Sequence, residues 1–68
     1  QIVEIRTPAK WAGETLADLN IRRKYGINIL AIHRGGSYMV SPSADSQLEA
    51  EDTLLVIGKE EDIEDLDA

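Results

Sequence analysis

The chain has 68 residues, a formal net charge of −6, one histidine and no cysteine, which excludes disulfides and argues against a zinc cluster. The negative charge argues against nucleic acid as a partner, because duplex binding needs a basic face, and against docking on an anionic membrane. A core this small barely offsets the cost of ordering the chain, so we expect one domain over residues 1–68 that is stabilised by oligomerisation.

The first segment of the chain predicts a strand and a connector. Residues 2–7 alternate apolar and polar positions and place Val3 and Ile5 on one face, as in a half-buried strand that ends before Pro8. Trp11 follows in the connector "PAKWAG". We expect its indole ring to plug the rim of the core rather than to stack on a base.

Two short helical segments are predicted next. The stretch "ETLADL" places Leu16 and Leu19 three residues apart, which is typical of the apolar face of a helix. Asn20 suits the N-cap of a second turn, "IRRKY". Gly26 suits the left-handed residue that ends that turn.

The second half of the chain predicts three strands and a closing helix. "INILAIHR" is β-branched and nearly all apolar, as in a central strand covered on both faces. The "GG" at 35–36 predicts a hairpin turn into "SYMV". After the polar connector "SPSADSQLEAED", "TLLVIG" predicts another buried strand and "KEEDIEDLDA" a helix with acidic residues in its first turn. The predicted fold class is therefore α+β, in the order β-α-β-β-β-α.

A basic cluster and one isolated amide are the polar features that need an explanation. Arg22, Arg23 and Lys24 suit a solvated helix end, where cations complement the helix dipole. They also suit an anion site, because arginine offers a planar fork of donors that matches phosphate. Asn28 lies on a strand expected to be buried, where an unpartnered amide costs about 1–3 kcal/mol. It therefore bonds to neighbouring backbone or meets a ligand at an interface, and the sequence leaves both alternatives open.

Signals for catalysis, metal binding and membrane insertion are weak. His33 is the only histidine, no local motif supplies the carboxylate and nucleophile that a catalytic base needs, and we expect no enzyme. The acidic tail lacks the spacing of a calcium loop and suits a solvated helix face. No apolar run approaches the roughly 18 residues that span a bilayer, so we expect no direct membrane insertion. The absence of cysteine fits a cytoplasmic protein.

Several stretches in fixed order resemble the C-terminal subdomain of RCK (TrkA-C) regulators of potassium transport. These stretches are "GETLADLNIRRKYGINILAI", the "RGG" turn, "SP", "EDTLLVIG" and a terminal Ile-Leu helix. The resemblance covers essentially the whole chain. It departs at Glu51, where the family usually carries glycine before Asp52, and we expect the turn there to differ. Because the chain opens at Gln1 without methionine, we expect it to be part of a longer protein.

The resemblance implies a homodimeric domain that senses a small cytosolic ligand and acts on a membrane-embedded potassium transporter or channel subunit. In Ktr-type gating subunits of Gram-positive bacteria the subdomain binds cyclic di-AMP at the dimer interface, through an arginine, an asparagine and an apolar wall. The matching ligand-binding positions here are Leu16, Asn20, Ile21, Arg22, Asn28, Ile29 and Ala44. Ala44 stands where the family often has proline, so we expect less contact with the ligand. No cofactor is implied.

Two other functions compete with this hypothesis. The domain can serve as a structural module that dimerises and transmits motion in a channel or antiporter, with the basic cluster paired to acidic neighbours. It can also sense a divalent cation through the carboxylates of residues 45–67. Thermal stabilisation by a nucleotide, by calcium or by neither separates the three hypotheses.

Overall fold

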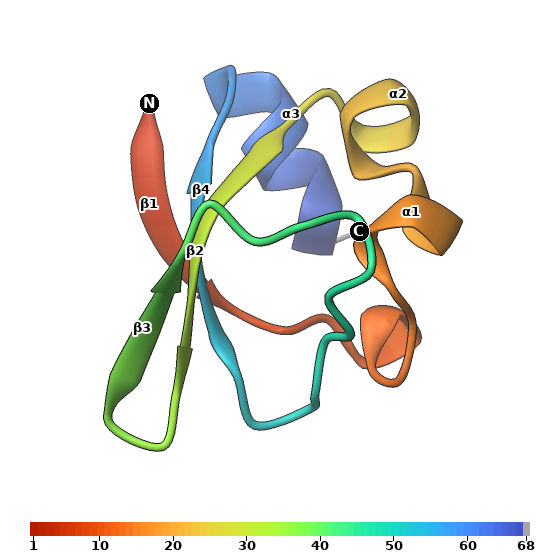
Figure 1. Ribbon diagram of the computed structural model, residues 1–68. Coiled ribbons are helices and arrows are strands. Elements are labelled where there is room, and N and C mark those ends of the chain that lie inside the picture. The colour runs from red at the N-terminus through yellow and green to blue at the C-terminus, as the bar shows by residue number, and fades with distance from the viewer. Residues whose placement is uncertain (68) are drawn as a thin grey trace.

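The computed structural model describes residues 1–67 and is built on a four-stranded antiparallel sheet in the order β1-β4-β2-β3. Figure 1 shows the helices gathered against one face of this sheet. The strands are β1 (Ile2–Arg6), β2 (Asn28–Arg34), β3 (Ser37–Val40) and β4 (Thr53–Ile57). The helices are η1 (Ala9–Trp11), α1 (Leu16–Leu19), α2 (Ile21–Tyr25), α3 (Glu60–Glu64) and η2 (Asp65–Asp67). The predicted α+β class and the order β-α-β-β-β-α are confirmed.

The strand patterns explain which side of the sheet is buried. In β1 the exposed and half-buried residues alternate, so Val3 and Ile5 pack against the core as predicted. β4 also alternates, with Leu54 and Val56 fully buried between half-buried neighbours. No residue of β4 is exposed, so the predicted buried strand is confirmed, and its alternation shows that one face of the sheet is buried more deeply than the other.

The two predicted turns at glycine are confirmed. Gly35 and Gly36 have φ angles of 56° and 82°, which is the backbone that a tight two-residue hairpin between β2 and β3 requires. Gly26 ends α2 with a φ of 75°, and its N–H donates to the carbonyl of Arg22. Both turns depend on a left-handed backbone that glycine adopts without steric cost.

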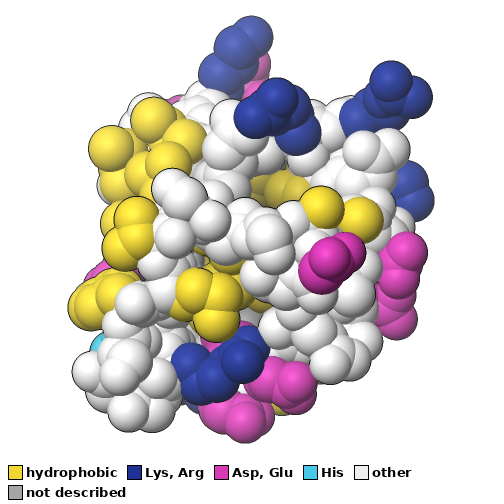
Figure 2. All heavy atoms as spheres, in the orientation of Figure 1, with side chains coloured by type: hydrophobic (Ala, Val, Ile, Leu, Met, Phe, Trp, Pro, Cys, Tyr) yellow, Lys and Arg dark blue, Asp and Glu magenta, His cyan; other side chains and the backbone are white. Residues whose placement is uncertain are grey.

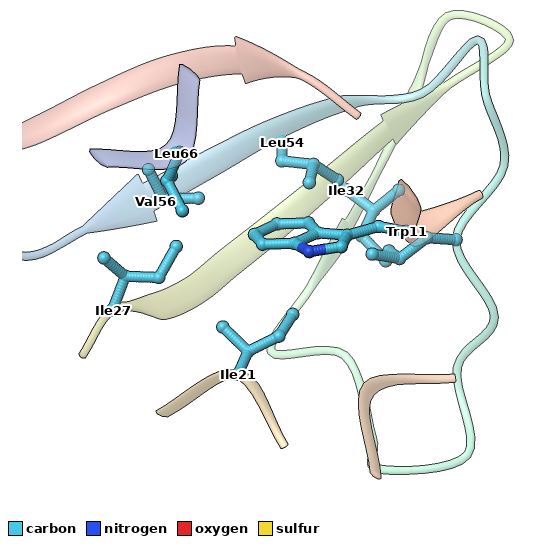
Figure 3. Packing of buried hydrophobic residues seen from close by; sticks show 8 residues of the cluster. Trp11, Ile21, Ile27, Ile32, Leu54, Val56 and Leu66 are labelled. Carbon is cyan, nitrogen blue, oxygen red and sulfur yellow. The ribbon is translucent and has the colours of Figure 1, made fainter. Parts of the chain in front are cut away.

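The core is centred on Trp11, whose side chain is 0% exposed. Figure 3 shows its indole ring among Ile21, Ile32 and Leu54, with Val56 and Leu66 nearby. The prediction that Trp11 plugs the rim was wrong, because η1 folds back under the sheet and places the ring between the two layers. Its Nε1–H has no hydrogen-bond partner within the described residues.

The capping of the two short helices differs from the prediction. Thr15 caps α1 by accepting a hydrogen bond from the N–H of Asp18 at 3.1 Å. Asn20 joins α1 to α2 in a left-handed conformation with a φ of 50°, and its side chain makes no capping hydrogen bond. Asn20 is therefore used for its tolerance of a positive φ rather than for its amide.

The prediction that β2 is covered on both faces holds only for the middle of the strand. Its register against β4 shifts between Ile29 and Ala31, so an extra residue interrupts the alternation. Ala31 and Ile32 are buried in the middle of the strand, whereas Asn28 at its start is exposed. The apolar composition therefore predicted the strand but not the exposure of its first residue.

Candidate functional site

A groove of about 380 Å³ lies where α1, α2 and the start of β2 meet the connector between β3 and β4. In Figure 2 a hollow with apolar side chains inside it and basic side chains above it lies in the upper half of the molecule. All seven residues predicted to bind a ligand line this groove: Leu16, Asn20, Ile21, Arg22, Asn28, Ile29 and Ala44. The volume falls within the range of small-molecule sites.

The polar side of the groove is a bonded pair. The Nε–H of Arg22 donates to Oδ1 of Asn28 at 2.8 Å, and both side chains are exposed. Among the side chains of residues 1–66, no carboxylate lies within salt-bridge distance of Arg22. The sequence left open whether Asn28 bonds to neighbouring backbone or meets a ligand. In this chain its hydrogen-bond partner is the side chain of Arg22 and not neighbouring backbone. The bond fixes one edge of the guanidinium and leaves its terminal nitrogens free to meet an anion.

The apolar side of the groove is continuous with the core. Ile21 is 6% exposed and belongs to the core, while Leu16 and Ile29 pack against the core and remain partly exposed. The groove therefore has a wall that is held in place by the packing of Trp11 beneath it. Such a wall offers a flat aliphatic surface to a planar ring.

Three further residues line the groove that sequence reasoning missed: Ala17, Ile27 and Pro42. Pro42 is half-buried and lies two residues before Ala44, so the groove has a proline in this wall although not at the position where the family often carries it. The motif "SP" contributed to the family resemblance, but Pro42 was not assigned to the binding site.

The connector of residues 41–52 forms a wall of the groove beside α1 and is tied to that helix through the backbone. The N–H of Ala17 donates to the carbonyl of Ala44 at 2.9 Å, and the N–H of Leu16 donates to the carbonyl of Ser46 at 3.0 Å. Figure 1 shows the connector leaving β3, running beside α1 and returning to β4. The two walls of the groove are therefore linked by hydrogen bonds rather than by side-chain packing alone.

An ion pair at the far end of the connector was also missed by the sequence analysis. Arg34 donates from Nε and from a terminal nitrogen to the two carboxylate oxygens of Asp52, at 2.8 and 2.7 Å. The Asp52 side chain is 0% exposed and also accepts the N–H of Glu49 at 2.9 Å. The hydrogen bond from Arg34 holds the pKa of Asp52 below its usual range, against the opposing effect of burial, and Asp52 in turn raises the pKa of Arg34.

The turn at Glu51 lies next to the ion pair and has a backbone conformation that is open to glutamate. The turn is closed by the N–H of Asp52, which donates to the carbonyl of Glu49 at 3.0 Å. Glu51 is not among the described residues with a positive φ. The turn therefore needs no glycine at this position, which explains how the chain accommodates glutamate there.

The remaining chemical candidates lie outside the groove. His33 stacks on Tyr38 with ring centroids 4.4 Å apart, on the hairpin of β2 and β3. The described residues contain no group of three or more acidic or histidine side chains placed to hold a metal ion. In the same range, no helix has the length and apolar character needed to cross a bilayer.

Comparison with known proteins identifies the family. The family model of the TrkA-C domain matches residues 1–68, and the chain belongs to this family. It is 53% identical over 62 residues to the Ktr system potassium uptake protein C of Bacillus subtilis (strain 168), a match that covers 91% of this chain and 28% of that protein. The chain thus spans about a quarter of the length of this curated relative. The prediction of the TrkA-C family is confirmed.

Two solved structures share the fold and were determined with a nucleotide. The RCK C domain of the potassium transport protein KtrA in complex with cyclic di-AMP is 43% identical, with a TM-score of 0.88, and the match covers 96% of this chain and 76% of that one. The RCK_C domain dimer of S. agalactiae BusR in complex with cyclic di-AMP is 28% identical, with a TM-score of 0.84 and coverage of 93% and 86%.

One of these similar proteins has also been solved with DNA. The structure of S. agalactiae BusR with its promoter DNA matches 93% of this chain, which covers 32% of that protein. The family therefore includes a domain that occurs in a DNA-bound protein, so a negative net charge is no evidence about the partners of the whole protein. The predicted absence of a nucleic-acid partner, like the predicted absence of catalysis, stays a prediction.

Proposed function

We propose that this domain binds cyclic di-AMP in the groove between α1, α2, β2 and the connector, at the interface of a cytoplasmic homodimer. The bound nucleotide biases the arrangement of the two chains and thereby regulates a membrane-embedded potassium transporter or channel subunit. The observation that carries the proposal is the convergence of all seven predicted residues on one groove. Further support comes from the similar KtrA and BusR domains, which were solved with this nucleotide.

The chemistry of the groove suits this ligand. Cyclic di-AMP is two-fold symmetric and carries two phosphates, so an isologous dimer presents one Arg22 to each phosphate. The guanidinium is already oriented by Asn28 at 2.8 Å, which lowers the entropy lost when the phosphate binds. The aliphatic side chains of Leu16, Ile21 and Ile29 then lie against the adenine rings.

Two arginines on the same helix give a matched test of this site. Arg22 and Arg23 are adjacent, exposed and in the last turn of α2, but Arg22 lines the groove and Arg23 does not. We expect Arg22→Ala to weaken cyclic di-AMP binding by about 1.5–3 kcal/mol, as loss of a charged hydrogen bond does. Arg23→Ala is expected to bind like the unmodified chain. Titration calorimetry measures both.

Equal effects of the two substitutions would contradict the assignment of Arg22 and would point to general electrostatic attraction instead. If the unmodified chain shows no thermal stabilisation by a panel of nucleotides, the structural dimerisation module is the better account. A calcium-dependent rise in melting temperature without any nucleotide effect would favour the cation sensor.

A further inference from the structure

We propose that Arg34 and Asp52, which lie outside the groove, set the gap between its two walls and thereby set its affinity for ligand. They are positioning residues, since neither lines the groove. This inference rests on the proposed function only where it concerns affinity. The geometry of the connector that it invokes can be tested without any ligand.

The ion pair anchors one end of the connector to the sheet. Arg34 ends β2, and its fork holds both carboxylate oxygens of Asp52 at 2.8 and 2.7 Å. The same guanidinium donates to the carbonyl of Gln47 at 2.9 Å. One arginine therefore forms hydrogen bonds with the connector at Gln47 and at Asp52, five residues apart. A single ammonium group does not reproduce this set of contacts.

Asp52 passes this constraint to the rest of the connector. Its side chain accepts the N–H of Glu49 at 2.9 Å, and its backbone carbonyl accepts both the N–H and the hydroxyl of Thr7 at 3.1 Å. The fully buried Leu48 lies between these contacts and packs in the core. Residues 47–52 are therefore fixed to the sheet by a buried charge, by hydrogen bonds and by one apolar anchor.

The fixed part of the connector holds the segment that leads to the groove. Gln47 donates from Nε2 to the carbonyl of Gly13 at 2.7 Å, and Leu48 exchanges backbone hydrogen bonds with Gly13 and Glu14 at 2.7 and 2.9 Å. The ladder continues from Ser46 to Leu16 and from Ala44 to Ala17. Leu16, Ala17 and Ala44 line the groove. The separation of its walls therefore depends on the position of the connector that Arg34 and Asp52 fix.

Loss of the fork is expected to loosen both walls without removing any group that touches the ligand. Arg34→Met keeps the aliphatic stem but leaves Asp52 buried without its cation, and this variant risks a general loss of stability. Arg34→Lys keeps a positive charge beside Asp52 but loses the two-pronged contact with its carboxylate and the hydrogen bond to Gln47. Comparison of the two variants separates the effect of losing the positive charge from the effect of losing the geometry of the guanidinium contacts.

The test measures cyclic di-AMP affinity by calorimetry and thermal stability on the same samples. We expect Arg34→Met to bind roughly tenfold more weakly or worse, in line with loss of a charged hydrogen bond, and Arg34→Lys to lie between it and the unmodified chain. Val3→Ala on β1 is the control, because it lowers stability from the far edge of the sheet. It is expected to leave the affinity unchanged. Unchanged affinity in both Arg34 variants overturns the proposal.

A second measurement keeps the inference separate from the identity of the ligand. Amide hydrogen exchange of Leu16 and Ala17 reports the two hydrogen bonds between the walls directly. If the unmodified chain does not bind cyclic di-AMP, the proposed function fails. The inference still stands if Arg34→Lys speeds exchange at these two amides and Val3→Ala does not, and it falls if their exchange is the same in the unmodified chain and in Arg34→Lys.

Discussion

At the scale of single residues, Asp52 stands out as a charged side chain that is fully buried. A carboxylate that is 0% exposed has a high desolvation cost, and its side chain offsets that cost with two bonds from Arg34 and one from the backbone. The partner Arg34 is 40% exposed, so water weakens the attraction between the charges. The geometry of the bonds therefore contributes more than the bare charge.

Asp52→Asn is expected to lower the free energy of unfolding at pH 7 by about 1–3 kcal/mol, which is the range for a buried acceptor that loses a charged partner. The pKa of Asp52 is lowered in the folded state, chiefly by the hydrogen bond from Arg34. Its contribution is therefore fully present above the unfolded-state pKa of about 3.9 and is lost as the pH falls through the folded value.

Urea unfolding of the two proteins from pH 7 down to pH 2 measures this dependence. The difference in stability between the unmodified chain and Asp52→Asn is expected to stay constant down to about pH 4 and to shrink below it. A difference that does not change with pH would show that the pKa of Asp52 is the same in the folded and unfolded states, contrary to the ion pair described here.

Residue-level features were only partly predictable from the sequence. The family positions named seven residues, and the structure places all of them around one groove. The exposure of Asn28 depends on an interrupted register within β2, which the apolar composition of "INILAI" does not reveal. The ion pair of Asp52 could not be predicted, because its partner Arg34 lies 18 residues away in the sequence. Pairing over that separation is decided by the path of the connector.

At the scale of elements, the residue after β4 and the residue before β2 approach one another so closely that only glycine fits at position 58. A Cβ added at Gly58 would lie 2.6 Å from Cγ2 and 3.3 Å from Cβ of Ile27. Ile27 is fully buried and lines the groove, so it has little space to move aside. The φ of Gly58 is not positive, which leaves steric contact as the objection to a side chain.

Gly58→Ala is expected to destabilise the protein by about 1–3 kcal/mol, the usual cost of overpacking a core. Ile27→Ala removes the obstructing carbon and is destabilising by itself. We therefore expect Gly58→Ala to cost much less in the Ile27→Ala background, with a coupling that a double-mutant cycle in urea measures. Additive effects of the two substitutions would contradict the close contact.

Local sequence patterns predicted the helices and strands themselves, but they did not predict how these elements pack together. Period-two alternation predicted β1, and the glycine pair predicted the hairpin of β2 and β3, because both signals are contained within a few residues. The position of Trp11 depends on how η1 folds under the sheet. That position is set by long-range packing, and no pattern near residue 11 carries it.

At the scale of the whole molecule, the groove is half of a site if the ligand is two-fold symmetric. One chain presents an apolar wall and a single arginine that is oriented by Asn28. In the proposed dimer, a second copy related by a two-fold axis supplies the same groups to the other half of the nucleotide. Binding and assembly are therefore linked, and each is expected to strengthen the other.

Titration calorimetry of the 68-residue chain with cyclic di-AMP, with sedimentation analysis of the same samples, tests this account most directly. We predict saturable binding at protein concentrations on the order of micromolar, with about two chains per nucleotide, and a dimer in the saturated sample. Absence of binding heat at these concentrations, or one nucleotide bound by each monomeric chain, would contradict it.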